Sequence, residues 1–433
     1  ELNIDNNKIS NIQIQDLEFN LDKNYKKNIK NWNKKIADVI NLKGHFSDSI
    51  YKKLAVKSLI TLTNNWRSEY GDLHFDGLFP SYSYEWFYGF WSWDSWKQAV
   101  AVTKFDENLA KEQILTMFDY QDSLGMIPDV IYHNAEENNW RDTKPPLAGW
   151  AVYKIFVASN DTAFVKEILP KLVKYHYWWY KYRDHDFNGL CEFGSTDGTR
   201  IAAAWESGMD NAVRFDEAIM LKNSENAYSL NQESVDLNSY LYAEKQYLLK
   251  LAKIVNNISI IDGLEQESLK LKQAINSTFW DSETGYYYDV RIFNKEKIFV
   301  QGPESWIPLW AGVASKKQAE LVKQKILDRA KFNTKCPFPT LATDNLKFDP
   351  LKGYWRGPVW FDQAYFAIEG LSNYGYCEDA NKIAIKLLNN AEGLVNSNKA
   401  IRENYHPLTG EGLNANNFSW TAAHILMIMD VEK

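Results

Sequence analysis

The chain has few cysteines and no long hydrophobic segment. Its 433 residues include three cysteines, Cys191, Cys336 and Cys377, and none has the CxxC spacing of a zinc or redox motif. Neither a zinc site nor a disulfide framework is therefore expected, and the redox compartment stays open. No apolar run reaches the roughly 18 residues that a membrane-spanning helix needs, so we expect no membrane insertion.

The sequence also lacks a concentration of positive charge. The formal net charge is -7, and no stretch gathers Lys and Arg at the spacing of a phosphate backbone. We therefore expect no nucleic acid partner, and a neutral or weakly charged ligand fits better. The chain begins at Glu1 without a signal peptide, which is typical of a trimmed or mature product. A periplasmic or secreted monomer is expected, with a cytoplasmic location left open.

Aromatic residues, by contrast, are abundant. Phe, Trp and Tyr make up 15% of the chain, including 17 Trp. Flat, weakly polar rings complement the C–H faces of sugars, although part of this surplus is expected to fill a large core. The composition therefore favours a carbohydrate ligand.

Most of the chain has the periodicity of helices. Residues 1–27 are rich in Asn and Ile with weak alternation, which predicts an N-terminal arm or a strand or two. From there on, apolar residues recur at helical spacing, so residues 28–433 are expected to form one all-α domain. Candidate helices lie near residues 28–42, 48–66, 94–103, 106–123, 144–158, 161–182, 233–256, 264–278, 316–328, 358–373, 378–394 and 419–430.

Several of these helices have recognisable ends and long connections. Asp48 and Asp106 are placed to begin helices, and Gly393 to end one. Five connections exceed the ~12–15 residues usual for structureless loops, which favours a functional role. Alternating short and long connections suit a barrel of helical hairpins with the long loops at one end. These loops cover residues 67–92, 124–143, 183–232, 281–313 and 333–357.

The segment WESGMD (residues 205–210) is the first candidate for catalysis. It places the carboxylates of Glu206 and Asp210 four residues apart, beside a glycine and Trp205. An apolar neighbour raises the pKa of a carboxyl group, which suits a general acid working near neutral pH. The alternative is a helix N-terminus at which the acids cap free N–H groups.

A second candidate is the polar segment RENYHPLTGEG (residues 402–412). It lies between two apolar helices, so its polar groups must bond to one another or line a cavity. Both Glu403 and Glu411 could act as a base, and the residues alone do not rank them.

A third candidate is FWSWDSWK (residues 90–97), in which three tryptophans surround one aspartate. Asp94 could bind sugar hydroxyls while a tryptophan such as Trp91 supplies a stacking face. Alternatively, Asp94 or Ser95 caps the helix that begins here.

The segment DHDFNGL (residues 184–190) resembles the start of a calcium loop. Asp184, Asp186 and Asn188 supply oxygen ligands at positions 1, 3 and 5, followed by a glycine and the backbone carbonyl of Leu190. Position 12 is Ser195 rather than Glu, so any bidentate carboxylate must come from elsewhere. The alternative is a turn rich in Asp and Asn.

Several segments in the same order resemble glycoside hydrolase family 63, especially its bacterial α-glucosidase branch. The likeness runs from about Gly89 to His424. It comprises FWSWDSWKQA, NWRDTKPPLAGW (139–150), WESGMD, SLNQESVD (229–236), GYYYDVR (285–291), YWRGPVW (354–360), and ENYHPLTG followed by NFSWTAAH. The resemblance implies an (α/α)6 barrel, a toroid of six helical hairpins, that hydrolyses α-glycosides with inversion.

The resemblance also assigns roles to particular residues. Asp210 matches the general acid of the family and Glu403 the general base, which resolves the choice against Glu411. The α-glucosidase branch completes its calcium loop with the Glu of QESVD, here Glu233. The resemblance thus implies a structural Ca²⁺ held by Asp184, Asp186, Asn188, Leu190 and Glu233, and no organic cofactor.

The chain also departs from the larger relatives. Too few residues precede the first shared motif for their N-terminal β-sandwich domain, and the regions flanking Asp210 are short. Compact members of the family include hydrolases of mannosylglycerate and glucosylglycerate, which need cations for the glycerate carboxylate. Arg141, Lys144 and Arg356 could serve, but they lie in motifs shared with the α-glucosidases.

The main expectation is an inverting, exo-acting α-glucosidase for small α-glucosides. The first alternative is a mannosylglycerate or glucosylglycerate hydrolase of the same fold and mechanism. A catalytically inactive sugar-binding protein is disfavoured because it needs neither acid nor base, and a polysaccharide lyase because the net charge is negative. The residues expected to bind the sugar are Trp91, Asp94, Lys144, Trp205, Glu206, Trp355, Arg356 and Trp360.

Overall fold

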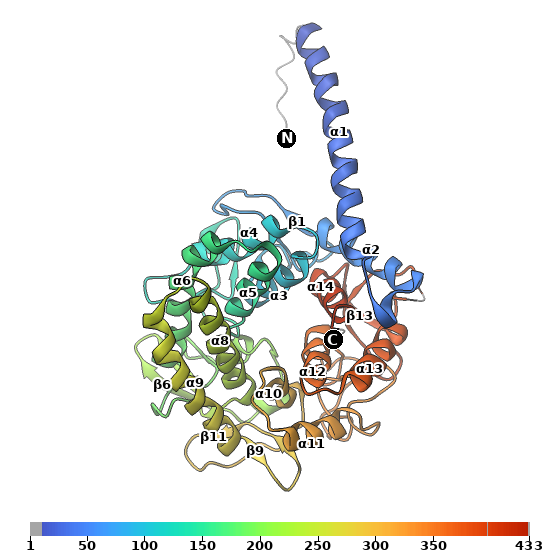
Figure 1. The fold of residues 1–433 in the computed structure, drawn as a ribbon. Helices are drawn as coiled ribbons and strands as arrows, with labels where there is room; N and C mark the ends of the chain where they lie inside the picture. Colours follow the sequence, from blue (N-terminus) through green and yellow to red (C-terminus); the bar gives the residue numbers. More distant parts are fainter. Residues whose placement is uncertain (1–10, 396, 432–433) are drawn as a thin grey trace.

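The structure is a computed structural model that describes residues 11–395 and 397–431, with side chains from residue 21 onward. These residues are mostly helical, as the sequence predicts, and contain fourteen α-helices and only short strands (Figure 1). Among the described helices, none is long and apolar enough to cross a bilayer.

The first helix, α1 (Asn11–Val39), projects away from the rest of the molecule (Figure 1). The strand expected in residues 1–27 is therefore replaced by helix from Asn11 onward, while residues 1–10 lie outside the described range. Leu21, Tyr25, Ile29 and Trp32 recur every three or four residues, which is a helical spacing. Their side chains are all exposed because the helix stands clear of the rest of the molecule.

Six helices form an inner ring. Each contacts the next, and the last contacts the first, so the ring is closed. Every residue of the first and last members is buried, because these helices face both the ring interior and an outer layer. The inner helices, in order of contact, are α3 (Ser92–Val102), α5 (Ala148–Ser159), α8 (Val235–Ile254), α10 (Ile307–Trp310), α12 (Phe361–Asn373) and α14 (Ser419–Ile428).

A second layer of helices packs outside this ring. These helices expose one face and bury the other, as their apolar periodicity predicts. Asp106 caps α4 by accepting a hydrogen bond from the N–H of Leu109 at 3.1 Å, which confirms that predicted helix start. The outer helices are α2 (Ser49–Asn64), α4 (Glu107–Asp119), α6 (Thr162–Tyr182), α9 (Ile258–Thr278), α11 (Lys316–Ile326) and α13 (Cys377–Asn390).

All twelve helices expected from periodicity are found, with shifted ends. Asp48 is the N-cap residue of α2 but makes no side-chain capping bond, and α13 ends at Asn390, before the expected Gly393. Two helices inside the long connections were not predicted, the short inner helix α10 and α7 (Arg200–Glu206). Both are too short to show a periodic pattern. Short 3-10 helices occur at Gly44–Phe46, Ala135–Glu137, Val213–Phe215 and Pro303–Trp306.

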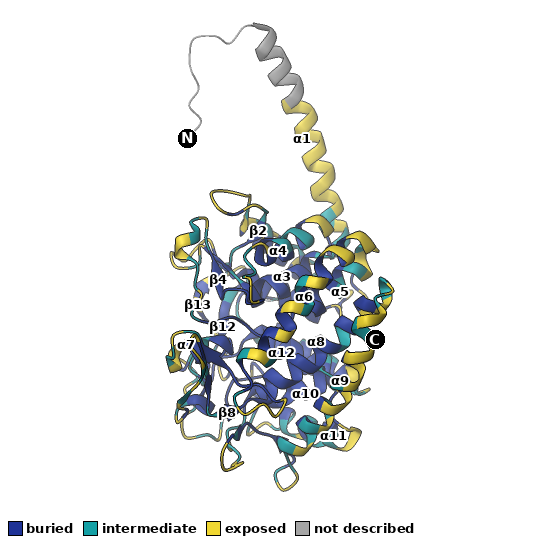
Figure 2. Ribbon diagram, turned by 90° about the vertical axis from the view of Figure 1, so that its left-hand side faces the viewer, coloured by how far each residue is buried: buried dark blue, intermediate teal, exposed yellow. Residues whose placement is uncertain are grey.

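The long connections carry short antiparallel sheets. β2, β4, β12, β13 and α7 lie along one side of the molecule, opposite α9 and α11 (Figure 2). The long loops therefore gather at one end of the ring. In the three-stranded sheet, β7 (Ala227–Leu230) lies between β5 (Gly194–Ser195) and β6 (Met220–Ser224). The two-stranded sheets pair β1 (Trp66–Arg67) with β2 (Gly77–Leu78), β3 (Phe90–Trp91) with β4 (Val130–Ile131), β8 (Gln232–Glu233) with β11 (Val290–Arg291), β9 (Trp280–Asp281) with β10 (Tyr286–Tyr287), and β12 (Arg402–Tyr405) with β13 (Gly412–Asn416).

Candidate active site

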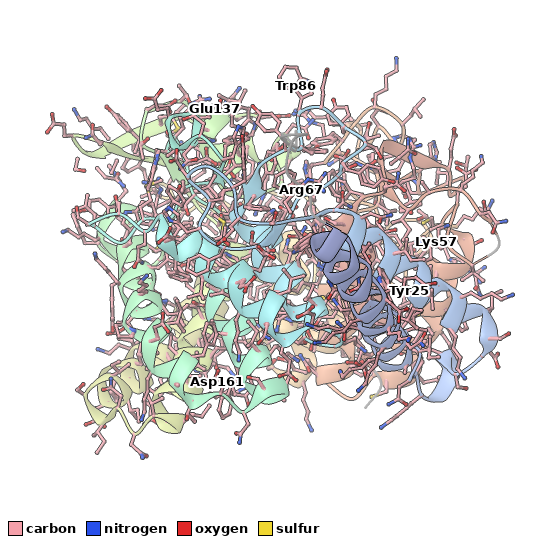
Figure 3. The ribbon with its side chains drawn as sticks, turned by 90° about the horizontal axis from the view of Figure 1, so that it is seen from above. Tyr25, Lys57, Arg67, Trp86, Glu137 and Asp161 are labelled. Carbon is pink, nitrogen blue, oxygen red and sulfur yellow. The ribbon has the colours of Figure 1, made fainter. Side chains whose placement is uncertain are left out.

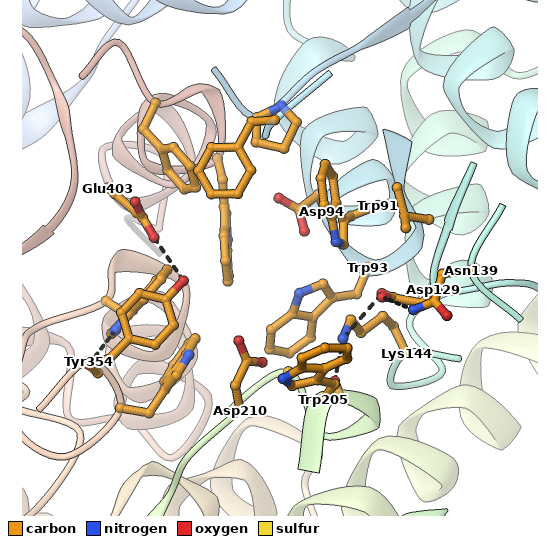
Figure 4. Close-up of a pocket in the computed structure, with 18 of the residues that line it drawn as sticks. Trp91, Trp93, Asp94, Asp129, Asn139, Lys144, Trp205, Asp210, Tyr354 and Glu403 are labelled. Carbon is orange, nitrogen blue, oxygen red and sulfur yellow. Dashed lines mark hydrogen bonds and ion pairs between the residues drawn. The ribbon is translucent and has the colours of Figure 1, made fainter. Parts of the chain in front are cut away.

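A cavity of about 400 Å³ lies among these loops (Figure 4). It is within the size range of small-molecule sites. Its walls come from segments far apart in the sequence, and they combine tryptophan rings with five carboxylates and one lysine. The lining residues are Pro80, Phe87, Trp91, Trp93, Asp94, Asp129, Val130, Tyr132, Glu137, Asn139, Lys144, Trp205, Gly208, Asp210, Tyr354, Trp355, Trp360, Glu403, Phe418 and Trp420.

Asp210 follows α7 and points into the cavity (Figure 4). The turn depends on Gly208, which has a φ of 73° and on which a Cβ would lie 2.1 Å from the ring of Trp93. Burial raises the pKa of Asp210 to about 7, and the charges of Asp129 and Glu403 add to this effect while Lys144 opposes it. Asp210 therefore exchanges a proton near neutral pH, as a general acid must.

Glu403 lies on β12 and enters the cavity from a different wall (Figure 4). Its Oε1 accepts a hydrogen bond from the hydroxyl of Tyr354 at 2.9 Å, and its Oε2 accepts one from the N–H of Ala415 at 3.1 Å. Burial raises the pKa of Glu403, and both hydrogen bonds oppose that shift. The alternative base, Glu411, is exposed and does not line the cavity.

Lys144 lies beside the carboxylates and is itself neutralised. Its ammonium is 3.1 Å from Asp129 Oδ1 and 3.5 Å from Asp142 Oδ2, and it also donates to the carbonyl of Trp205. Asn139 donates to the other oxygen of Asp129 at 3.0 Å. These contacts fix Lys144 as part of the wall next to Asp210, where it keeps the pKa of the acid from rising further.

Asp94 lies in the first turn of α3 but does not cap it. The N-cap residue is Trp91, and Ser95 donates to the Trp91 carbonyl at 2.8 Å, so the capping alternative is wrong for Asp94. Its carboxylate faces the cavity (Figure 4). Burial raises the pKa of Asp94 to about 7, while the charges of Lys97 and Lys144 oppose the shift. A carboxylate in this position can accept hydrogen bonds from sugar hydroxyls.

Tryptophans form much of the remaining wall. Trp91, Trp205, Trp355 and Trp360 all line the cavity. The rings of Trp355 and Trp360 are stacked, with centroids 4.1 Å apart and planes within 7° of parallel. Trp360 is fixed by a 3.0 Å hydrogen bond from its Nε1 to the carbonyl of Tyr354. Rigid aromatic faces of this kind suit the C–H faces of a sugar ring.

Further aromatic side chains lie at the cavity wall and next to it in the sequence. Phe87 lines it, and the neighbouring Tyr84 and Trp86 are exposed. Trp86 projects at the edge of the molecule (Figure 3). Tyr88 donates a hydrogen bond to Glu137 at 3.2 Å, which joins this loop to another segment of the cavity lining.

Glu206, which the sequence placed among the substrate ligands, does not reach the cavity. Its carboxylate pairs with the guanidinium of Arg183 at 2.7 Å, and both side chains are fully buried. Glu206 also accepts a 2.6 Å hydrogen bond from the N–H of Gly194. It ends α7 rather than starting a helix, so the capping alternative for WESGMD is also wrong.

Arg356 also lies away from this cavity. It pairs with Asp216 at 2.5 Å and donates to the carbonyl of Asn211 at 2.7 Å. It lines instead an adjoining cavity of about 650 Å³, which shares Trp205, Asp210 and Tyr354 with the first. We call this the outer cavity.

The outer cavity contains a second arginine. Arg200 donates to the backbone carbonyls of Phe215 and Asp216, and no ion pair joins it to an acid among the residues that the structure describes. By contrast, Arg141 pairs with Asp197 at 2.6 Å. Arg200 therefore retains charge that an anionic group on a ligand could neutralise.

Several residues of the site were not predicted from the sequence. Tyr354 contacts the candidate base, Asp129 pairs with Lys144, and Asn139 donates a hydrogen bond to Asp129. Tyr354 and Asn139 lie within segments that the resemblance had already singled out, so membership of a motif was the available signal for these two, whereas Asp129 lies outside those segments. The other lining residues without a predicted role are Pro80, Phe87, Trp93, Val130, Tyr132, Glu137, Gly208, Phe418 and Trp420.

The residues of the expected calcium loop lie together, away from the cavity lining. Asp184 accepts hydrogen bonds from the N–H groups of Asn188 and Gly189 at 3.0 and 2.9 Å. The amide of Asn188 donates to Asp186 at 3.0 Å and to Glu233 at 2.6 Å. Leu190 donates its N–H to Asn188 at 2.8 Å.

The structure adds Glu192, which was not predicted. One carboxylate oxygen from each of Asp184, Asp186 and Glu192 lies within 4.8 Å of the other two. We call Asp184, Asp186, Glu192 and Glu233 the acidic cluster.

Comparisons with known proteins place the chain in a family. The family model for the mannosylglycerate hydrolase MGH1-like glycoside hydrolase domain matches residues 87–421. A mannosylglycerate hydrolase from Thermus thermophilus is 25% identical over 401 residues, covering 77% of this chain and 92% of the relative. A crystal structure of a family 63 mannosylglycerate hydrolase from that organism, in complex with Tris and D-glycerate, has a TM-score of 0.71 at 23% identity and covers 86% of this chain and 99% of that one.

The chain belongs to glycoside hydrolase family 63. It is therefore a glycoside hydrolase, as the sequence predicts. A neutral trehalase from Saccharomyces cerevisiae shares the fold, with a TM-score of 0.67 at 17% identity, covering 85% of this chain and 77% of that one. The similarity to the mannosylglycerate hydrolases spans the cavity walls from Phe87 to Trp420.

Proposed function

We propose that this family 63 hydrolase is an inverting, exo-acting α-glycosidase on an (α/α)6 barrel. The closed ring of six inner helices and its six outer neighbours supports the barrel assignment. The observation that carries the mechanism is that Asp210 and Glu403 enter one cavity from different walls in unlike surroundings (Figure 4). Carboxyl groups in different environments are the usual basis for dividing acid and base roles.

In the proposed reaction, Asp210 donates its proton to the glycosidic oxygen as the bond to the anomeric carbon breaks. Glu403 takes a proton from a water molecule, and the water oxygen bonds to the anomeric carbon from the opposite face. The hydrogen bonds from Tyr354 and Ala415 hold Glu403 in orientation. An α-linked substrate then yields a β-sugar and a free alcohol. Asp94 and the tryptophans bind the sugar.

The substrate class is proposed to be an α-glycoside of glycerate. The relatives named mannosylglycerate hydrolase favour this first alternative over the α-glucosidase that was the main expectation. Of the cations considered from the sequence, Arg141, Lys144 and Arg356 already pair with acids. Arg200 in the outer cavity, which adjoins Asp210, is therefore proposed to bind the glycerate carboxylate.

Two matched substrates test this assignment. α-Mannosylglycerate and α-mannosylglycerol differ in the carboxylate, so kcat/KM should be higher for the glycerate compound. Arg200→Met should remove most of that preference while leaving hydrolysis of the glycerol compound nearly unchanged. An Arg200→Met enzyme that keeps the full preference would contradict the role of Arg200. Faster hydrolysis of maltose or kojibiose than of either would favour the α-glucosidase.

The anomeric outcome tests the mechanism independently of the substrate. Proton NMR of the first turnovers should show the β-anomer of the released sugar, since a water held by Glu403 attacks opposite the leaving group. Initial formation of the α-anomer would require a covalent intermediate, and the assignment of Glu403 as base would be wrong.

We also propose a structural Ca²⁺ at the acidic cluster, held by Asp184, Asp186, Asn188, the Leu190 carbonyl and Glu233. Hard oxygen donors at this density suit Ca²⁺, and its charge would offset those of the carboxylates. Glu192 Oε1 and Glu233 Oε2 are buried without a hydrogen-bond partner among the described residues. The ion would join the loop after α6 to β8. Calcium should raise the melting temperature and a chelator lower it.

A further inference from the structure

Lys295 places an ammonium group at the acidic cluster. Its Nζ lies 3.0 Å from Glu233 Oε1 and 3.8 Å from Asp186 Oδ2. The residue lies in a tight turn after β11, where its φ is 56° and its N–H donates to the carbonyl of Arg291 at 3.0 Å. The backbone is thus held by the turn, while the side chain remains 54% exposed.

This ammonium contacts an oxygen that a metal ion would use. Glu233 Oε1 receives both Lys295 and the amide of Asn188, whereas Glu233 Oε2 has no partner among the described residues. Glu233 is fully buried, and its negative charge is costly there without a nearby cation. A divalent ion and the Lys295 ammonium would therefore neutralise the same carboxylates, and they cannot both occupy contact distance from the same oxygen.

We propose that Lys295 is a built-in competitor for the divalent cation at the acidic cluster. The inference rests on the proposed Ca²⁺ site. When the ion is absent, the ammonium neutralises Glu233 and keeps the loop formed. When the ion binds, the ammonium moves toward solvent, which its half-exposed side chain on a surface turn permits. The ion must displace a bound charge, so its affinity is lower than the same ligands would give without the ammonium.

Lys295→Met separates these two effects, because methionine keeps the aliphatic volume and removes the charge. Lys297→Met is the matched control, since Lys297 follows the same turn but pairs with Asp281 at 3.7 Å. Calcium affinity is measured by isothermal titration calorimetry of the chelator-treated protein. The melting temperature is recorded with EDTA and with excess calcium. Glu233→Gln tests whether the titrated ion occupies the acidic cluster. If it does, this variant should bind calcium much more weakly than the wild type.

Lys295→Met should lower the Kd for calcium by about tenfold or more, the scale of one charge at contact distance. It should melt below the wild type in EDTA, and calcium should remove that difference. Lys297→Met should change neither the Kd for calcium nor the melting temperature in EDTA. If calcium binds to Lys295→Met but not to the wild type, the ammonium takes the place of the ion in the wild type, and this result would also support the inference.

Equal calcium affinity in the wild type and Lys295→Met would overturn the inference while leaving the calcium site intact. Absence of calcium binding in both would overturn the calcium site and the inference together. If Lys295→Met and the wild type have the same melting temperature in EDTA, the ammonium does not stabilise the loop, and the competition model is wrong.

Discussion

The pKa of Asp210 leads to a quantitative prediction for the pH dependence of hydrolysis. Burial raises this pKa to about 7, so roughly nine-tenths of the groups are protonated at pH 6 and one-tenth at pH 8. If Asp210 must donate a proton, kcat/KM should fall about tenfold from pH 6 to pH 8, and about tenfold per pH unit beyond. Initial rates at low substrate concentration across this range measure the effect.

Asp210→Asn tests the assignment because it removes the proton donor. Hydrolysis of a natural glycoside should fall by at least ~10²-fold and lose its alkaline limb. An α-glycosyl fluoride, whose leaving group needs little protonation, should lose far less activity. Asp94→Asn is the matched control, since Asp94 lines the same cavity and also has a pKa of about 7. As a sugar-binding group, it should affect both substrates equally.

The same pKa predicts the direction of a stability change. Since the folded-state pKa of Asp210 is above the unfolded value, ionisation disfavours the folded state increasingly from about pH 4 to pH 7. Asp210→Asn removes that penalty, so it should raise the melting temperature more at pH 8 than at pH 5.

Equal loss of activity on the fluoride and the natural glycoside, or an alkaline limb that survives Asp210→Asn, would refute the assignment of Asp210 as general acid.

Glu403→Gln should reduce kcat by ~10²–10⁴-fold while substrate still binds, whereas the exposed Glu411→Gln should change it by less than about twofold; similar losses in both would contradict the choice of base. Tyr354→Phe removes a hydrogen bond that lowers the pKa of Glu403, so the acidic limb of kcat/KM should move to higher pH. An acidic limb that stays at the same pH would show that the Tyr354 hydrogen bond does not control the pKa of the catalytic base. Glu206→Gln leaves the buried Arg183 without a counter-charge and should lower the free energy of unfolding by about 3–5 kcal/mol in chemical denaturation; a near-neutral change would show that water reaches the pair.

Helices could be predicted well from the sequence because their signal is local. Apolar residues at helical spacing mark each long helix, and Asp106 marks the start of α4. The short helix α10 escaped prediction although it completes the inner ring, because four residues make one turn and show no period. The N-terminal segment was misjudged since its alternation was too weak to separate a strand from the helix α1.

The active site was less predictable because its contacts are distant in the sequence. Glu206 and Asp210 stand four residues apart in one motif, yet Arg183 binds the first and leaves the second facing the cavity. Nothing in the motif reveals a partner 23 residues away. The residues alone also left Glu403 and Glu411 equivalent, and the resemblance chose the one that lines the cavity.

The closure of the ring links catalysis to the order in which the protein is made. The inner helix α14 packs against α2 and α3, so it completes a wall that these two earlier helices start. Glu403 and Trp420 are synthesised after Asp210. A growing polypeptide therefore carries Asp210, the proposed acid, before it has Glu403, the proposed base, or the part of the wall that Trp420 supplies. If Asp210 and Glu403 act as proposed, a chain stopped short of β12 should have no hydrolytic activity.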